Sequence, residues 1–112
     1  MKRYPVVFAP EAQEQLAALY GYIAVAASPA IAERYTTAIV NYCETLQTSP
    51  QRGTKRDDIR PGLRITNYKG RAVIAFDVSE DHVSIIGVFY GGQDYATALH
   101  PPDEPVNPTQ AL

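Results

Sequence analysis

Two stretches in the first half of the chain repeat apolar residues with the spacing of an amphipathic α-helix. The steps alternate between four and three residues, which places the apolar positions on one helix face. These positions are Ala12, Leu16, Leu19, Ile23 and Ala26, and then Ala32, Tyr35, Ile39, Tyr42 and Leu46. Pro10 suits the start of the first helix, and Ser28-Pro29 suits the N-cap and first turn of the second. The short connection predicts an antiparallel helical hairpin that ends before Pro50.

The second half changes to the apolar runs that are typical of β-strands. Residues 63–67 alternate apolar and polar side chains, residues 72–78 are almost continuously apolar, and residues 83–90 form a third such run. We expect these three strands to form an antiparallel meander. A short β-prone run at residues 4–8 precedes the helices, and the polar segment 51–62 is expected to be a loop.

The order of one strand, two helices and three strands predicts the α+β class. The helical hairpin is expected to cover one face of a single, mostly antiparallel sheet. Residues 1–99 are expected to form one domain, with a short helical turn from Asp94 to Leu99. The acidic segment 100–112 contains four prolines and is expected to be extended or loosely attached.

Composition limits the class of protein. The chain has 112 residues, of which 46% are hydrophobic and 20% charged, as expected for one globular domain. Cys43 is the single cysteine, so an internal disulfide is impossible and a reducing, cytoplasmic location is expected. No apolar run approaches the ~20 residues that a membrane span needs.

Positive charge is concentrated in one segment, although the whole chain carries a net charge of −2. Residues 52–71 hold seven of the ten basic side chains and only two acidic ones. Such a segment attracts acidic partners over about a Debye length, ~8–10 Å at physiological salt. The alternative is a solvated loop whose charges happen to cluster.

Metal and cofactor chemistry find little support in the residues. Cys43, His82 and His100 have no partners at metal-ligand spacing. Cys43 also falls within a helical apolar pattern, which favours a core position over a nucleophile. The glycines lack the spacing of a nucleotide-binding loop. We therefore expect no metal and no cofactor.

Metal-free RNA cleavage is one chemistry that remains open, because it needs only an acid, a base and cations at the phosphate. Arg64 and Arg71 are candidates if they lie near each other across the first meander hairpin, with Tyr90 beside them. In the plain alternative, the arginines are exposed cross-strand residues and Tyr90 is a half-buried aromatic. Tyr35 and Tyr42 are expected in the core, whereas Tyr22 lies off the apolar stripe and suits a partner-facing surface.

An ordered set of segments resembles the RelE/ParE toxins of type II toxin–antitoxin systems. The resemblance covers residues 4 to about 99, and the tail from His100 departs from it. The matching segments are residues 8–12 at the first helix, 59–64 before the meander, Gly70-Arg71 at the middle strand, and 88–94 at its end. The resemblance implies a small toxin that is held inactive by an antitoxin whose C-terminal segment wraps around it.

Two activities divide the family that the chain resembles. RelE-like members cleave mRNA on the ribosome, whereas ParE-like members block DNA gyrase and have no established catalytic centre. Gly91, Gly92 and Gln93 stand where RelE-like members carry a basic residue, and the net charge is acidic. The sequence Pro61-Gly62-Leu63-Arg64 also looks more ParE-like.

The hypothesis is therefore a ParE-like gyrase inhibitor that is neutralised by a ParD-like or similar antitoxin and does not itself bind specific DNA. The alternatives are a RelE-like ribonuclease and a non-toxic binding protein that retains the fold. Contact with the target or antitoxin is predicted for Arg56, Arg60, Arg64, Lys69, Arg71 and Asp94.

Overall fold

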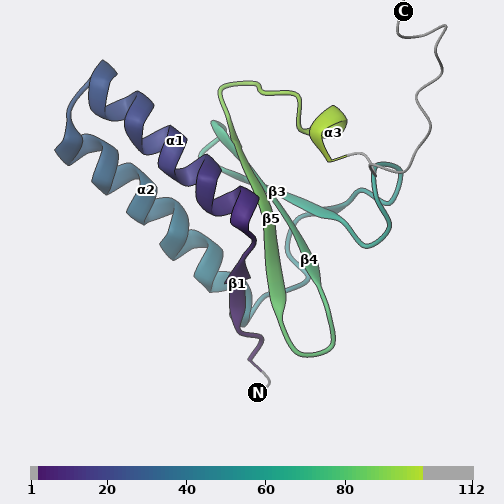
Figure 1. The fold of residues 1–112 in the computed structure, drawn as a ribbon. Helices are drawn as coiled ribbons and strands as arrows, with labels where there is room; N and C mark the ends of the chain where they lie inside the picture. The colour runs from purple at the N-terminus through teal and green to yellow at the C-terminus, as the bar shows by residue number, and fades with distance from the viewer. Residues whose placement is uncertain (1–2, 100–112) are drawn as a thin grey trace, which may run out of the picture.

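The computed structural model describes residues 3–99, and the tail at 100–112 lies outside the described residues. A strand, β1 (Val6–Phe8), leads into helix α1 (Pro10–Ala26), and α2 (Pro29–Glu44) returns antiparallel to it. Ser28 caps α2, because its hydroxyl accepts a hydrogen bond from the amide of Ile31 at 3.1 Å. The predicted helical hairpin is thus confirmed (Figure 1). A short 3₁₀ turn, η1 (Thr45–Gln47), follows α2.

The strands form one five-stranded sheet in the order β1-β5-β4-β3-β2. The meander consists of β3 (Arg64–Tyr68), β4 (Ala72–Val78) and β5 (Val83–Tyr90), all paired antiparallel. Only β1 and β5 pair in parallel within the described residues. The other strand pairs are antiparallel, so the sheet is mostly antiparallel as expected. A two-residue strand, β2 (Thr54–Lys55), lies within the segment predicted as loop. Its backbone pairs with β3, a long-range contact that has no local apolar signature.

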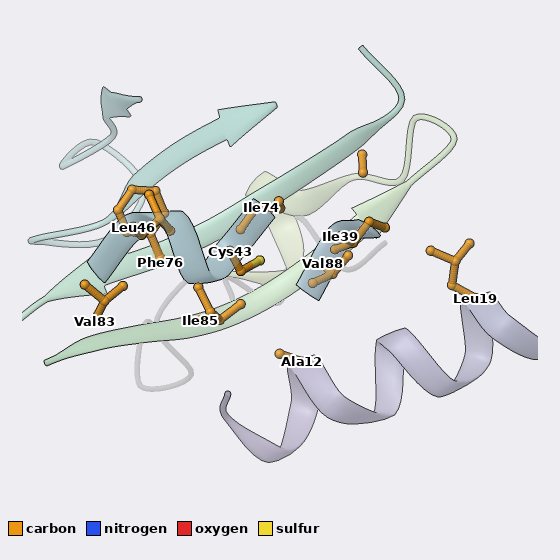
Figure 2. Packing of buried hydrophobic residues seen from close by; sticks show 11 residues of the cluster. Ala12, Leu19, Ile39, Cys43, Leu46, Ile74, Phe76, Val83, Ile85 and Val88 are labelled. Atoms are coloured by element: carbon orange, nitrogen blue, oxygen red, sulfur yellow. The ribbon is translucent and has the colours of Figure 1, made fainter. Parts of the chain in front are cut away.

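The helices cover one face of the sheet and form the larger core. Figure 2 shows Ile39, Cys43 and Leu46 facing β4 and β5, with Ala12 and Leu19 of α1 beside them. The sheet contributes Ala72, Ile74, Phe76, Val83, Ile85 and Val88. Most of the predicted helix stripe is buried or half-buried, but Ala26 at the end of α1 is exposed.

A smaller cluster covers the opposite face of the sheet. The chain between β2 and β3 contributes Ile59 and Leu63, and the short helix α3 (Tyr95–Ala98) is followed by buried Leu99. Figure 1 shows α3 on the side of the sheet away from the two long helices. The expected helical turn at residues 94–99 is confirmed, with Asp94 as its N-cap. This second layer was not part of the sequence prediction.

Gly53 lets β2 approach β3, and this requirement gives a test of the fold. Gly53 and Gly62 both have φ +82°, which is unfavourable for alanine. A Cβ on Gly53 would overlap the carbonyl oxygen of Ile65, whereas a Cβ on Gly62 meets nothing within 4 Å.

Gly62→Ala should therefore cost about 1 kcal/mol of unfolding free energy, from backbone conformation alone. Gly53→Ala should cost roughly 1–3 kcal/mol more, because backbone has to move. Urea denaturation of both variants measures the difference. Equal losses would contradict the close approach of β2 to β3.

Candidate partner-binding surface

Arg56 in the basic segment is engaged within the protein. Its guanidinium donates to both carboxylate oxygens of Asp58 at 2.9 Å and to the hydroxyl of Tyr95 at 3.1 Å. The hydrogen-bonded carboxylate raises the pKa of Arg56, and Arg56 in turn lowers the pKa of Asp58. Because Tyr95 belongs to α3, Arg56 holds this helix against the sheet.

Arg64 is also tied to its own chain. Its guanidinium donates to the carbonyl and side-chain oxygens of Gln51, both at 2.8 Å, and to the carbonyl of Arg52 at 3.3 Å. Arg52 lies over the ring of Tyr42, with 5.3 Å between the guanidinium carbon and the ring centroid. These two arginines thus fasten the chain after η1 to β3 and α2.

The remaining cations of the predicted set face solvent to a greater degree. Lys69 and Arg71 are exposed in the turn between β3 and β4, and Arg60 is half-buried in the segment before β3. None of the three forms an ion pair within residues 3–99. Their charge is available to a partner, unlike that of Arg56.

The turn that carries Lys69 and Arg71 has an unusual backbone. Lys69 has φ 52° and Gly70 has φ 69°, and the amide of Arg71 donates to the carbonyl of Tyr68 at 3.2 Å. Two positive φ values in succession define a type I′ hairpin turn, in which asparagine and glycine are the favoured residues. A lysine here costs stability but places its ammonium 5.6 Å from the Tyr68 ring centroid, at the end of the sheet.

Three tyrosines gather at this end of the sheet. Pairing places Tyr68, Ala72 and Tyr90 in one row across β3, β4 and β5. Tyr35 of α2 packs over the row, with its ring centroid 6.1 Å from that of Tyr68 and 5.8 Å from that of Tyr90. The small side chain between the two strand tyrosines leaves room for the third ring.

The hydroxyl of Tyr35 is buried and has no hydrogen-bond partner in the described part of the chain. Burial is the main cause that raises the pKa of Tyr35, aided by the neighbouring Tyr90 and Tyr68 hydroxyls. The positive charge of Arg71, which immediately precedes β4 at this end of the sheet, opposes this rise. Tyr35 was expected in the core. The burial of its hydroxyl without a hydrogen-bond partner, and the effect of Arg71 on its pKa, were not predicted.

Arg64 and Arg71 do not lie near each other, contrary to the expectation from sequence. Arg64 pairs with Phe76, whereas Arg71 precedes Ala72 at the other end of the hairpin. Arg71 lies five residue steps along the chain from Phe76, or ~17 Å at ~3.3 Å per residue. The sheet therefore brings Arg71 and Tyr90 to one end and leaves Arg64 at the other.

A groove runs between α1 and the end of β5, beside the tyrosine cluster. Its volume is about 400 Å³, and its lining includes Leu19 and Tyr22 from α1 with Val88 and Tyr90 from β5. Tyr22 is 65% exposed. The prediction of a partner-facing surface at Tyr22 remains a prediction, now placed at the rim of this groove.

Asp94, which was predicted to contact a partner, caps α3. Its carboxylate accepts from the amide of Thr97 at 3.2 Å and from its hydroxyl at 2.7 Å. These hydrogen bonds lower the pKa of Asp94. The local role of this residue is therefore structural.

Residues 3–99 contain no group of three or more histidine, cysteine or acidic side chains that could hold a metal ion. Cys43 is fully buried, and burial raises its pKa to about 12. A thiol in this state is a poor nucleophile and fits the core role that its sequence position favoured. None of the helices in the described range is both long and apolar enough to cross a bilayer.

Residues 6–95 match the family described as the ParE toxin of the type II toxin–antitoxin system parDE. This match includes every strand and both long helices. The chain belongs to the ParE toxin family. The resemblance to RelE/ParE toxins is thereby confirmed.

Solved structures agree with the ParE family fold. The chain is similar to one in the chromosomal ParDE toxin–antitoxin system from P. aeruginosa, with a TM-score of 0.70 and 21% identity over 79% of this chain and 96% of that chain. It is also similar to a chain of the RelBE2 toxin–antitoxin complex from Mycobacterium tuberculosis, with a TM-score of 0.59 and 21% identity over 83% and 97% of the two chains. Comparison with curated protein sequences gives no match.

The hydroxyls of Tyr35 and Tyr42 provide a matched test of the cluster. The hydroxyl of Tyr42 shares a 3.0 Å hydrogen bond with Thr66, whereas that of Tyr35 has no partner. Tyr42→Phe should lower the unfolding free energy by about 1–2 kcal/mol, and Tyr35→Phe should leave it unchanged or raise it by about 1 kcal/mol. Urea denaturation distinguishes the two results. An equal loss in both variants would show that the Tyr35 hydroxyl has a partner.

Proposed function

We propose that this ParE family member is the toxin of a type II toxin–antitoxin pair, that it inhibits DNA gyrase by binding, and that a cognate antitoxin neutralises it. The observation that carries this proposal is the family match over residues 6–95. It is supported by the two similar structures, which both belong to toxin–antitoxin systems.

The geometry of the cations favours binding over RNA cleavage. A ribonuclease using Arg64, Arg71 and Tyr90 needs the three side chains around one phosphate. Here the guanidinium of Arg64 is held by Gln51, several strand residues from the other two. Arg71 and Tyr90 stay together at one end of the sheet, beside a groove without charged lining residues, an arrangement that suits a protein surface.

Expression of the chain alone in bacteria tests the proposed target. We expect growth arrest with altered plasmid supercoiling and a DNA-damage response, all relieved by co-expression of the cognate antitoxin. In vitro, the purified chain should inhibit supercoiling by purified gyrase, and equimolar antitoxin should restore it.

Other outcomes would identify the alternatives. Arrest with rapid mRNA loss and normal supercoiling would replace gyrase inhibition with RelE-like cleavage, and Arg71→Ala would then be expected to abolish the cleavage. The absence of any growth effect, with gyrase unaffected in vitro, would indicate a non-toxic binding protein.

The exposed cations are proposed to steer the antitoxin, which must then present acidic groups. The candidates are Arg60, Lys69 and Arg71, because Arg56 is already paired with Asp58. The double variant Lys69→Gln/Arg71→Gln should slow association ~10-fold at low ionic strength and weaken its salt dependence.

The matched control is Arg3→Gln/Lys55→Gln, which removes two exposed cations elsewhere on the surface. Association rates measured by stopped flow at several salt concentrations compare the pairs. If both double variants slow association equally, net charge alone explains the effect, which would contradict steering by the turn at residues 69–71.

A further inference from the structure

The helical hairpin exposes apolar side chains in a region that carries no charge. Five large hydrophobic side chains are exposed within residues 3–99, and four of them lie on this hairpin, namely Tyr20, Tyr22, Val25 and Ile31. Val25 is 90% exposed. Residues 15–32 contain no charged side chain, and Figure 1 shows the end of α1 well clear of the strands. An exposed apolar region of this kind is typical of an interaction surface.

Gly21 lies in the middle of this region and is not required by packing within the chain. A Cβ on Gly21 would meet nothing within 4 Å, and Gly21 is not among the glycines with positive φ. Glycine inside a helix lowers stability relative to alanine, because it loses more backbone freedom on folding. Its small size does, however, let another backbone approach α1 closely.

The residues one turn away from Gly21 share its face of α1. Ala17 and Val25 lie four residues before and after Gly21, and all three residues are exposed. A shallow depression of about 400 Å³ between α1 and α2 adjoins Ala17, and no charged residue lines it. The face thus offers a protruding side chain at Val25 and a recessed surface at Ala17. An interface between two identical copies needs both features on the same surface.

Charge at the ends of this face favours an antiparallel arrangement of two copies. Glu14 lies seven residues before Gly21, and Ser28, the N-cap of α2, lies seven residues after it. Seven helical residues span ~10 Å. Two α1 helices that cross antiparallel at Gly21 would therefore place each Glu14 level with the N-terminus of the other copy's α2, where the helix dipole stabilises a carboxylate. A parallel arrangement would instead set the two Glu14 carboxylates against each other.

We propose that two copies of this chain associate through α1 in a two-fold, antiparallel arrangement that crosses at Gly21. Val25 of each copy then lies level with Ala17 of the other copy, since both are four residues from the crossing. The contact between residues 14 and 28 is only ~21 Å long. Contacts of this size are small and transient, so we expect reversible association with a Kd of ~10–100 μM.

The proposed contact adjoins the groove beside β5, because Tyr22 lines that groove and Val25 lies one turn further along α1. Self-association would therefore cover part of the outer side of α1 that a different partner could also reach. The inference goes beyond the proposed function and does not depend on it, because the association involves neither antitoxin nor gyrase.

Sedimentation velocity of the full chain from ~1 to ~500 μM tests the association, since this range spans the expected Kd. Val25→Glu places a carboxylate on the contact and should weaken association ~10-fold or more. The matched control is Val7→Glu, the same substitution at a 51% exposed residue of β1, and it should leave association unchanged. Circular dichroism checks that both variants fold. A chain that stays monomeric at every concentration, or equal weakening by both variants, would overturn the proposal.

A cysteine cross-link tests the crossing point, because the native Cys43 is fully buried. Gly21→Cys brings two thiols together at the crossing, so oxidation with copper phenanthroline should link most of the chain into dimers. The control is Gln13→Cys, at an exposed position eight residues earlier on α1. Its two copies would lie ~24 Å apart along the helices, whereas a disulfide requires Cα atoms within ~7 Å. Efficient linking through position 13, or none through position 21, would overturn the antiparallel register.

Binding assays distinguish the other occupants of this face. If the unmodified chain stays monomeric while Val25→Glu weakens binding to the cognate antitoxin or to purified gyrase ~10-fold or more, the face belongs to that partner and the proposal is overturned. If the chain forms the dimer but neither binds antitoxin nor inhibits gyrase, the proposed function fails and this inference stands.

Discussion

The parallel pairing of β1 with β5 determines how the rest of the molecule is arranged. It covers only three residues of β5, from Val83 to Ile85, before the chain turns into α1. This pairing starts α1 beside β5, and the hairpin with α2 then buries one sheet face. The same short strand leaves the end of β5 uncovered, so the core and the open edge have one cause.

The basic segment serves two purposes that the sequence does not separate. Arg56 and Arg64 donate hydrogen bonds within the protein itself. Arg56 holds α3 through Tyr95, and Arg64 holds the chain after η1 through Gln51. Lys69 and Arg71 remain exposed in a turn whose backbone does not favour lysine. Residues held in an unfavourable conformation occur often at functional sites, which agrees with a binding role for this turn.

Much of the fold could be predicted because it follows from local periodicity. Pro10 indicated the observed start of α1, and the apolar runs indicated the observed bounds of β4 and β5. β2 could not be predicted, because a two-residue strand exists only through its pairing with β3. The wrong placement of Arg64 beside Arg71 had a similar origin, since strand register depends on the turn geometry at Lys69 and Gly70.

The candidate surface was predictable only in part. Charge clustering indicated Lys69 and Arg71, and an off-stripe position indicated Tyr22. Gln15 gave no signal, because its contact with Val88 joins residues that are 73 positions apart. Gln93 lies three residues from Tyr90, after two glycines, and its hydrogen bond to the Tyr90 amide was not predicted.

The central claim is that this ParE family chain works through one protein-binding surface, formed by the outer side of α1, the end of β5 and the turn at residues 69–71. Peptide-level hydrogen–deuterium exchange of the full chain, free and bound to its antitoxin, examines this surface most directly. The account predicts that protection on binding is concentrated in these three segments. Protection confined to α3 and residues 56–63, on the opposite sheet face, would contradict it.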